Sequence, residues 1–275
     1  MNKLAILAFS LLIFFSTMSW YLANGSLNEY LKSQVLLQSQ YYSGQQTLLL
    51  NANYTADKGQ TTLEQLSLSN LNGFSQPQLL TLDKVTAQLA QVASTQLNSP
   101  SIQNKNISVI NIEKITLSKL HVWSEHTIDG KNNLEELVKQ VSKQLALDYP
   151  ALYPNISAKL YAKEHPELDA SEDIAYLEKQ TGSQPVETNK AVIAAKEAKQ
   201  KKLLLGKAQT RALISSIVIQ DLKLTTIKNN KSITKSFSNI ELGQIGDENG
   251  LDTNQLGGEL LRVLLNKLIS LKKSP

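Results

Sequence analysis

The sequence contains no cysteine, and only two of its 28 cationic side chains, Arg211 and Arg262, are arginine. Without thiols the chain has no cysteine nucleophile, zinc finger, iron–sulfur cluster or disulfide. The lack of disulfides leaves the compartment open, because oxidising compartments permit disulfides without requiring them. The shortage of arginine weighs against nucleic-acid binding, since bidentate recognition of phosphates and bases favours arginine.

The charge is also spread too evenly for a nucleic-acid-binding surface. The net charge is +4 and the pI is near 9.0, but the lysines are scattered among aspartates and glutamates. This distribution is typical of a solvated surface rather than a basic stripe, and we expect no nucleic-acid partner. The chain has 275 residues and 41% hydrophobic residues, which is enough for a packed core in one large or two small domains.

Motifs for catalysis and metal binding are missing as well. The sequence has no Gly-x-Ser-x-Gly turn, and the glycines of "GQIGDENG" lack the lysine and serine of a phosphate-binding loop. His121, Glu125 and His126 stand close in sequence, but on a strand positions 121 and 126 point to opposite faces. We therefore expect no enzyme, metal or cofactor. An envelope hydrolase stays as an alternative, because catalytic triads are assembled in space.

The N-terminus gives the clearest indication of cellular location. Lys3 is followed by no further charge until Glu29, and residues 4–23 are long enough to span a bilayer core as a helix. An uncleaved membrane anchor with interfacial aromatic residues is favoured over a cleavable signal peptide ending near residues 23–25. Both interpretations export the rest of the chain. The residues that mark the anchor are Leu4, Phe14, Phe15, Trp20 and Tyr21.

Four segments share one spacing, apolar–x–x–apolar–x–apolar–x–x–apolar. A helix face repeats at three or four residues and a half-buried strand at two, whereas this spacing mixes both. A two-residue gap moves a strand's side chains to the other face unless an extra residue bulges out. We predict strands bent at the double gap, which together form a curved sheet with an apolar concave side. The alternative is plain strands whose ends pack on different sides.

These repeat positions are the candidate residues of an apolar groove or core. They are Leu63, Leu66, Leu68 and Leu71, then Leu82, Val85, Ala87 and Ala90, then Ile112, Ile115, Leu117 and Leu120, and finally Ile219, Leu222, Leu224 and Ile227.

Helical patterns flank and interrupt these segments. Amphipathic helices are predicted over residues 26–42 and 254–273 and over a stretch capped by Asn132 or Asn133. Two prolines then interrupt the chain at 150 and 154, and further helices are predicted over 171–180 and 190–205. This predicts an α+β fold: a curved, mainly antiparallel sheet with a helical insert, a C-terminal amphipathic helix and an N-terminal transmembrane helix. The predicted parts are an anchor or signal segment (1–24), a first β part with its leading helix (25–130), the helical insert (131–206), and a second β part with the C-terminal helix (207–275).

Five segments follow one another in an order that is typical of a known family: "LEQLSLSNLNGFSQPQLLTLDKV", "ISVINIEKITLSKLHV", "NNLEELVKQV", "SIVIQDLKLTTI" and "FSNIELGQIG". In these segments the chain resembles the AsmA-like family of Gram-negative envelope proteins. It covers most of the chain except about residues 146–206. The resemblance implies an inner-membrane-anchored periplasmic protein with an apolar β groove, linked to phospholipid passage and outer-membrane upkeep.

The expected function is therefore non-catalytic. A single-pass inner-membrane protein would hold or shield lipid acyl chains on its curved sheet, or assist a larger lipid-carrying assembly. Its expected partners are the inner membrane, phospholipid and other envelope proteins, and no cofactor is expected. The alternative is an envelope scaffold with a closed core, which would bind a protein partner through its helical insert.

Overall fold

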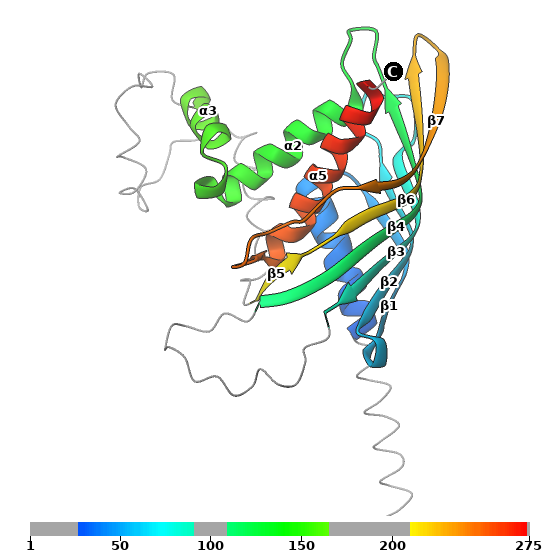
Figure 1. Ribbon diagram of the computed structural model, residues 1–275. Coiled ribbons are helices and arrows are strands. Elements are labelled where there is room, and N and C mark those ends of the chain that lie inside the picture. Colours follow the sequence, from blue (N-terminus) through cyan, green and yellow to red (C-terminus); the bar gives the residue numbers. More distant parts are fainter. Residues whose placement is uncertain (1–26, 91–108, 165–209, 274–275) are drawn as a thin grey trace, which may run out of the picture.

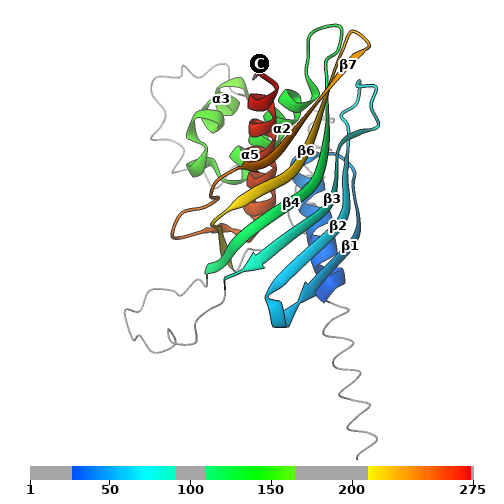
Figure 2. The same ribbon diagram turned by 45° about the vertical axis from the view of Figure 1, so that its right-hand side comes forward.

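The computed structural model describes residues 27–90, 109–164 and 210–273, which form a curved sheet with helices on its concave side (Figures 1 and 2). The strands are β1 (Thr47–Thr55), β2 (Gln60–Ser69), β3 (Gln78–Leu89), β4 (Val109–Glu125), β5 (Arg211–Ile214), β6 (Ile217–Lys228), β7 (Lys231–Glu241) and β8 (Leu251–Asp252). The helices are an N-terminal one over residues 27–43, α2 (Asn133–Asp148), α3 (Pro154–Glu164) and α5 (Thr253–Lys273), with 3-10 turns η1 (Ala56–Lys58) and η3 (Pro150–Leu152).

The fold is α+β, with a mostly antiparallel mixed sheet and a C-terminal helix. Strands β1 to β4 form an antiparallel meander, and β6 pairs with β7 in the same antiparallel manner. Strand β6 lies parallel to β4, with Leu120 opposite Leu222. A parallel pair needs a long crossover connection, and the segment that contains α2 and α3 supplies it.

The helices begin and end where local chemistry favours it. The helix over residues 27–43 is followed by Gly44 at φ +65°, a conformation that glycine adopts without strain. The side chain of Asn132 caps α2 by accepting hydrogen bonds from the backbone N–H groups of Leu134 and Glu135. The predicted helix over this stretch, with Asn132 as one of its two candidate caps, is confirmed.

The predicted interruption by two prolines is confirmed, since α2 ends at Asp148, but the sequence did not predict that each proline begins a new helical turn. Pro150 begins η3 and Pro154 begins α3, because proline's fixed φ suits the first helical position, where no N–H partner is needed. The helices predicted over 171–180 and 190–205 lie outside the described residues, as does the segment over 1–24. Within the described ranges, no helix is both long and apolar enough to cross a bilayer.

The core lies between the concave face of the sheet and the helices α2 and α5. The side chains contributed by α2 and α5 are almost fully enclosed, and so are the central strand residues that face them. This enclosed group is Leu120, Val122, Leu134, Leu137, Val141, Leu145, Ile214, Ile217, Ile219, Leu222, Leu224, Leu265 and Leu268.

Two glycines let α5 pack directly on the helix over residues 27–43. A Cβ atom on Gly258 would lie 2.7 Å from the ring of Tyr42, and one on Gly257 would lie 2.6 Å from Oε1 of Gln38. Hydrogen bonds reinforce the crossing, since the Tyr42 hydroxyl donates to the carbonyl of Asn254 (2.9 Å). These contacts fix both helices over the concave face.

Candidate functional site: the concave face of the sheet

One line of backbone irregularities crosses all six long strands at the same height, and we call it the seam. On both sides of the seam the inward residues are apolar, and two outward residues separate them in every strand. The flanking pairs are Leu49 and Ala52 in β1, Leu66 and Leu63 in β2, Leu82 and Val85 in β3, Leu120 and Leu117 in β4, Leu222 and Ile219 in β6, and Phe237 and Ile240 in β7.

In the alternate strands β2, β4 and β7, the seam consists of one residue whose backbone lies in the left-handed region. Gln65, Lys119 and Asn239 have φ values of +53°, +53° and +52°. Such a residue turns the following side chain back to the face it would otherwise leave. The pairing register is the same on both sides of the seam, because each neighbouring strand contains the same extra residue. The predicted bend at the double gap is confirmed here.

The seam keeps apolar side chains on the concave face on both of its sides. Nine candidate residues of the repeat are buried there: Leu68, Leu82, Val85, Ile115, Leu117, Leu120, Ile219, Leu222 and Leu224. The seven others are partly buried: Leu63, Leu66, Leu71, Ala87, Ala90, Ile112 and Ile227. The repeat therefore supplies both core residues and residues that solvent still reaches.

Three of the partly buried residues do not lie where the repeat predicts. Ala90 follows the end of β3, and Leu89 takes the inward position after Ala87. Leu71 belongs to the loop after β2, not to a strand. Ile227 lies on the convex face, because β6 pairs with β7 without a break from Leu224 onward and its side chains simply alternate. At Ile112 the prediction of a bulge is correct, since Ile112 pairs with Leu89 and Lys114 with Gln88, which leaves Glu113 without an opposite residue.

Sequence reasoning missed the part of the face that β1 and β7 contribute. Leu49 and Ala52 on β1, and Phe237 and Ile240 on β7, continue the same apolar row to both edges of the sheet. Each pair has the same two-residue gap as the repeat. That gap was the signal that could have found them, although neither segment carries the full repeat.

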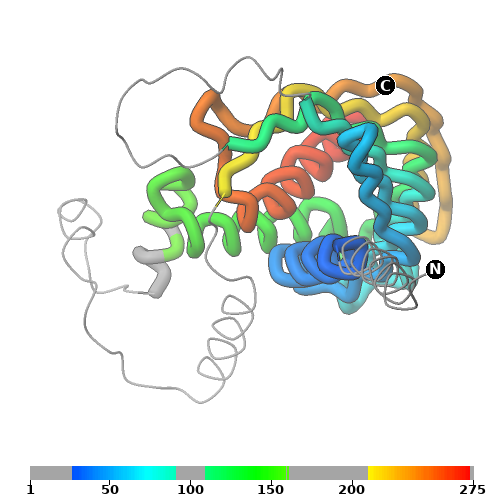
Figure 3. The backbone as a smooth tube through the Cα atoms, turned by 90° about the horizontal axis from the view of Figure 1, so that it is seen from below, coloured from blue at the N-terminus to red at the C-terminus, as the bar shows by residue number. Residues whose placement is uncertain are grey.

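The two ends of the concave face differ in how well they are covered. We call the end with the β1–β2 turn the lower end, and the end where β4 leads toward α2 the upper end (Figure 1). Near the upper end α2 and α5 seal the face. Toward the lower end Leu63 and Leu66 are only half-buried, although their neighbours in the sheet, Ala52, Val85 and Leu82, are buried. Figure 3 looks onto this lower end.

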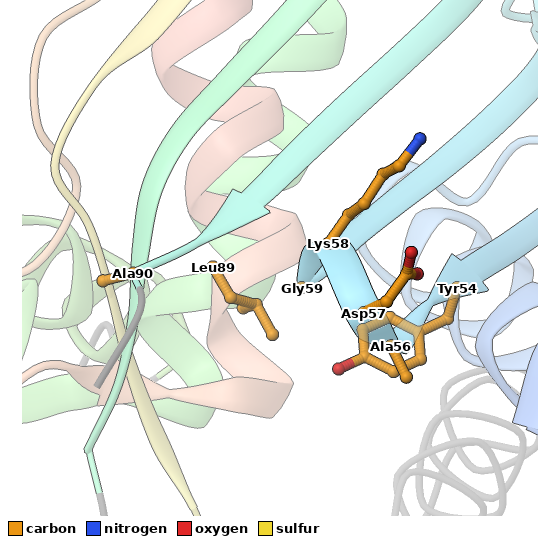
Figure 4. A pocket seen from close by; sticks show the side chains of 7 residues that line it. All are labelled: Tyr54, Ala56, Asp57, Lys58, Gly59, Leu89 and Ala90. Carbon is orange, nitrogen blue, oxygen red and sulfur yellow. The ribbon is translucent and has the colours of Figure 1, made fainter. Parts of the chain in front are cut away.

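A pocket of about 410 Å³ lies at the lower end, and we call it the mouth pocket. Its lining residues are Tyr54, Ala56, Asp57, Lys58, Gly59, Leu89 and Ala90. In Figure 4 the side chains of Tyr54 and Leu89 extend toward the pocket from β1 and β3, whereas Lys58 reaches away. Tyr54 follows Ala52 by two positions and Leu89 follows Ala87 by two, so both continue the inward-facing rows.

The start of the N-terminal helix is tied to this same corner. The backbone N–H of Tyr54 donates to Oδ1 of Asn28 (2.9 Å), and Nδ2 of Asn28 donates to Oδ1 of Asn53 (3.2 Å). One turn further, Nζ of Lys32 donates to the carbonyl of Leu50 (2.9 Å). These bonds cover part of the free edge of β1 and place the beginning of the helix beside the mouth pocket.

A buried polar cluster closes the upper end. Glu125 accepts hydrogen bonds from the backbone N–H groups of Ser75 (2.6 Å) and Gln76 (3.0 Å). Burial alone would raise the pKa of Glu125, but these donors outweigh it and hold the pKa below its usual value. Asn133 accepts from the N–H of Glu125 and donates to Oδ1 of Asn70 (3.0 Å). The cluster joins the β2–β3 loop, β4 and the start of α2.

The described histidines have separate surroundings. On the convex face, His121 stacks on Trp123 (3.9 Å between ring centres) and contacts the hydroxyl of Thr225. Nε2 of His126 lies 2.8 Å from Nζ of Lys272 in the last turn of α5. Burial is the main cause that lowers the pKa of both imidazoles. Among the described residues, no three His, Asp or Glu side chains are placed to hold a metal ion.

No protein-family model and no curated protein matches the chain. We therefore infer a function from the geometry of the concave face. That face combines apolar residues on both sides of the seam in every long strand, a sealed upper end and a half-covered lower end beside the start of the N-terminal helix.

Proposed function

We propose that this chain is a non-catalytic, membrane-anchored periplasmic protein of the AsmA-like type, and that the lower part of its concave face holds or shields lipid acyl chains. It would hold or shield an acyl chain by itself, or assist a larger lipid-carrying assembly. The resemblance of its sequence motifs supports this proposal, together with the apolar run over residues 4–23.

One observation carries the proposal: the apolar inner face continues through all six long strands, yet its lower part is only half covered. Without the seam, the side chains of each strand would alternate strictly between the two faces. Polar side chains would then point inward on the far side of the seam from Leu117 in β4 and from Leu66 in β2. Because the seam recurs at one height in every strand, it preserves an apolar strip from the core to the mouth pocket. An acyl chain laid along this strip would be an extension of the hydrophobic core.

Burial of methylene groups is sufficient to supply the binding energy. Each buried methylene contributes about 0.8 kcal/mol, so ten carbons of an acyl chain gain roughly 8 kcal/mol before the cost of ordering the chain is subtracted. This mode of binding needs no reacting group. It predicts that affinity depends on the length of the acyl chain more than on any single polar contact.

Mass spectrometry of lipids that co-purify with the full-length protein tests the proposal. We expect phospholipid to be bound in the wild type and reduced in Leu63→Gln, which places an amide on the inner face near the mouth pocket. Leu50→Gln is the matched control, because Leu50 lies in the neighbouring strand, is 54% exposed and can lose its apolar character at little cost. Equal lipid content in the two folded variants would contradict the proposal.

The sealed upper end favours a second candidate, an envelope scaffold with a closed core. Leu134, Leu137 and Val141 of α2 have no exposed surface and pack into the core near that end. A scaffold would co-purify without lipid in the wild type and in both variants. Its partner would bind elsewhere, with the insert around residues 146–200 as the first candidate surface.

A further inference from the structure

We infer that the β1–β2 turn and the first turn of the N-terminal helix form a surface that rests in the headgroup layer of the bilayer, so that the mouth pocket opens directly onto lipid. This inference rests on the proposed function in one respect, namely that residues 4–23 cross the membrane. It adds an orientation of the whole domain and a surface that contacts the membrane.

The length of the connecting chain sets the first constraint. Residues 24–26 separate the apolar run from residue 27, the first described residue of the helix. A fully extended chain advances at most about 3.6 Å per residue, so residue 27 lies within roughly 14 Å of the end of the run. The headgroup layer on one side of a bilayer is about 5–8 Å thick. The beginning of the helix therefore lies in this layer or just above it.

The hydrogen bonds of Asn28 extend this constraint to the β1–β2 turn. Because Asn28 is bonded to both Asn53 and Tyr54, the lower end of β1 shares the height of the helix start. The turn Ala56–Lys58 and Gly59 follow immediately and line the mouth pocket. Whatever depth the first helical turn reaches, the mouth pocket is beside it.

The side chains exposed at this corner suit a lipid interface. Leu27 and Tyr30 are 37% and 59% exposed on the first helical turn. Tyrosines are enriched at the membrane–water boundary, where an apolar ring and a polar hydroxyl are both accommodated. Lys58 is exposed on the turn, and a lysine side chain is long enough to reach lipid phosphates, while Leu89 lines the mouth pocket.

The opposite end of the domain is far from the membrane in this orientation. Gln60 pairs with Gln88, which pairs with Lys114, so the turn is level with Lys114. The strand from Lys114 to Glu125 covers roughly 36 Å at about 3.3 Å per residue. Ile128, fully exposed in the loop that follows β4, lies beyond that distance.

The absence of cysteine permits a direct test. Asp57→Cys and Ile128→Cys are introduced singly into the full chain, labelled with a fluorophore and reconstituted into vesicles that contain phosphatidylcholine with a nitroxide on its headgroup. We expect strong loss of fluorescence from position 57 and little from position 128. Equal quenching at the two sites, stronger quenching at 128, or no quenching at 57 would overturn the inference.

The outcome also separates this inference from the proposed function. If the chain does not remain with the vesicles during flotation, the anchoring is wrong, and both ideas fail together. If it floats but position 57 is not quenched, only the orientation is wrong. Lipid content in the Leu63→Gln comparison is measured independently and reports on acyl binding whatever the orientation.

Discussion

At the level of single residues, the concave face depends on three residues whose backbone has a positive φ. Gln65, Lys119 and Asn239 are not glycines, and a non-glycine residue in the left-handed region costs about 1–2 kcal/mol. The apolar residues on both sides repay this cost by staying inward. Polar residues with flexible side chains are compatible with such a position, whereas β-branched residues are strongly disfavoured there.

Substitution of Gln65 tests the seam. We expect Gln65→Val to lower the free energy of unfolding by about 1–2 kcal/mol, because a β-branched residue resists positive φ. Gln65→Gly should stay within about 1 kcal/mol of the wild type, since relief of strain offsets the greater freedom of the unfolded chain. Urea titration measures both. Glu64→Val, at the exposed neighbouring position, is the control, and a Gln65→Val variant as stable as this control would mean that β2 is straight.

A second residue-level prediction concerns Glu125 at the upper end. Glu125→Gln should reduce the free energy of unfolding at pH 7 by about 1–3 kcal/mol, because an amide cannot accept both backbone N–H groups with a full charge. The carboxylate's pKa is lowered by folding, so its contribution is present above the unfolded value near 4.3 and is lost as the pH falls through the folded pKa. The difference between wild type and variant should therefore shrink below about pH 4.3.

A second variant, Glu113→Gln, serves as the control for the pH dependence of Glu125→Gln. Glu113→Gln removes an exposed carboxylate from the same strand and should change stability little at any pH. Thermal unfolding of the three proteins between pH 3 and pH 7 gives the two differences. A Glu125→Gln difference that stays constant down to pH 3 would show that the charge of Glu125 does not hold the β2–β3 loop.

At the level of secondary-structure elements, two helices are held over the sheet by close backbone approach. Alanine favours a helix over glycine by about 1 kcal/mol, yet a methyl group on Gly258 would enter the ring of Tyr42. We expect Gly258→Ala to lower the free energy of unfolding by about 1–3 kcal/mol in spite of its higher helix propensity. Asn266→Ala, at an exposed position of α5, is the control and should be neutral or slightly stabilising.

If Gly258→Ala is as stabilising as Asn266→Ala, α5 does not cross the N-terminal helix at Gly258. Unfolding by guanidinium chloride, monitored by circular dichroism, is the appropriate measurement because both variants keep the same helix content. The comparison separates intrinsic propensity from packing, since both substitutions introduce alanine into the same helix.

The strands and their bends could be predicted from sequence because the cause is local. An apolar–x–x–apolar gap inside an alternating pattern requires either a change of face or an extra residue, and the structure has the extra residue at Lys119 and Gln65. The gap after Leu224 looks identical but has no bulge, because Ile227 is accommodated on the convex face. Local spacing does not reveal which of the two solutions the rest of the fold will favour.

Features that depend on distant contacts could not be predicted. The parallel pairing of β4 with β6 joins segments separated by the whole insert, and no residue pattern in either strand specifies that partner. The mouth pocket likewise depends on the β1–β2 turn lying beside the end of β3, so Tyr54 and Leu89 gave no signal in the sequence. The candidate site was thus predictable as an apolar strip, but its open end was not.

At the level of the whole molecule, the sealed and half-covered ends give the fold a direction. Polar contacts around Glu125 and Asn133 close the upper end, while the lower end meets the start of the N-terminal helix. A lipid chain entering at the mouth pocket would meet Leu89 and Val85 first and would stop where α2 and α5 fill the core. We therefore predict a short binding site that is open at the lower end only and holds part of one acyl chain.

Site-specific photo-crosslinking in cells tests whether the lower part of the concave face holds a lipid chain. A benzophenone amino acid is placed at Leu63, on the inner face below the seam, or at Leu48, on the outer face of β1 and 56% exposed. Cells are grown with radiolabelled phosphate, irradiated, and the purified protein is examined for label that resists denaturation. We expect phospholipid adducts at position 63 and few at position 48. Equal labelling of the two positions, or no labelling at position 63, would contradict acyl-chain binding on the concave face.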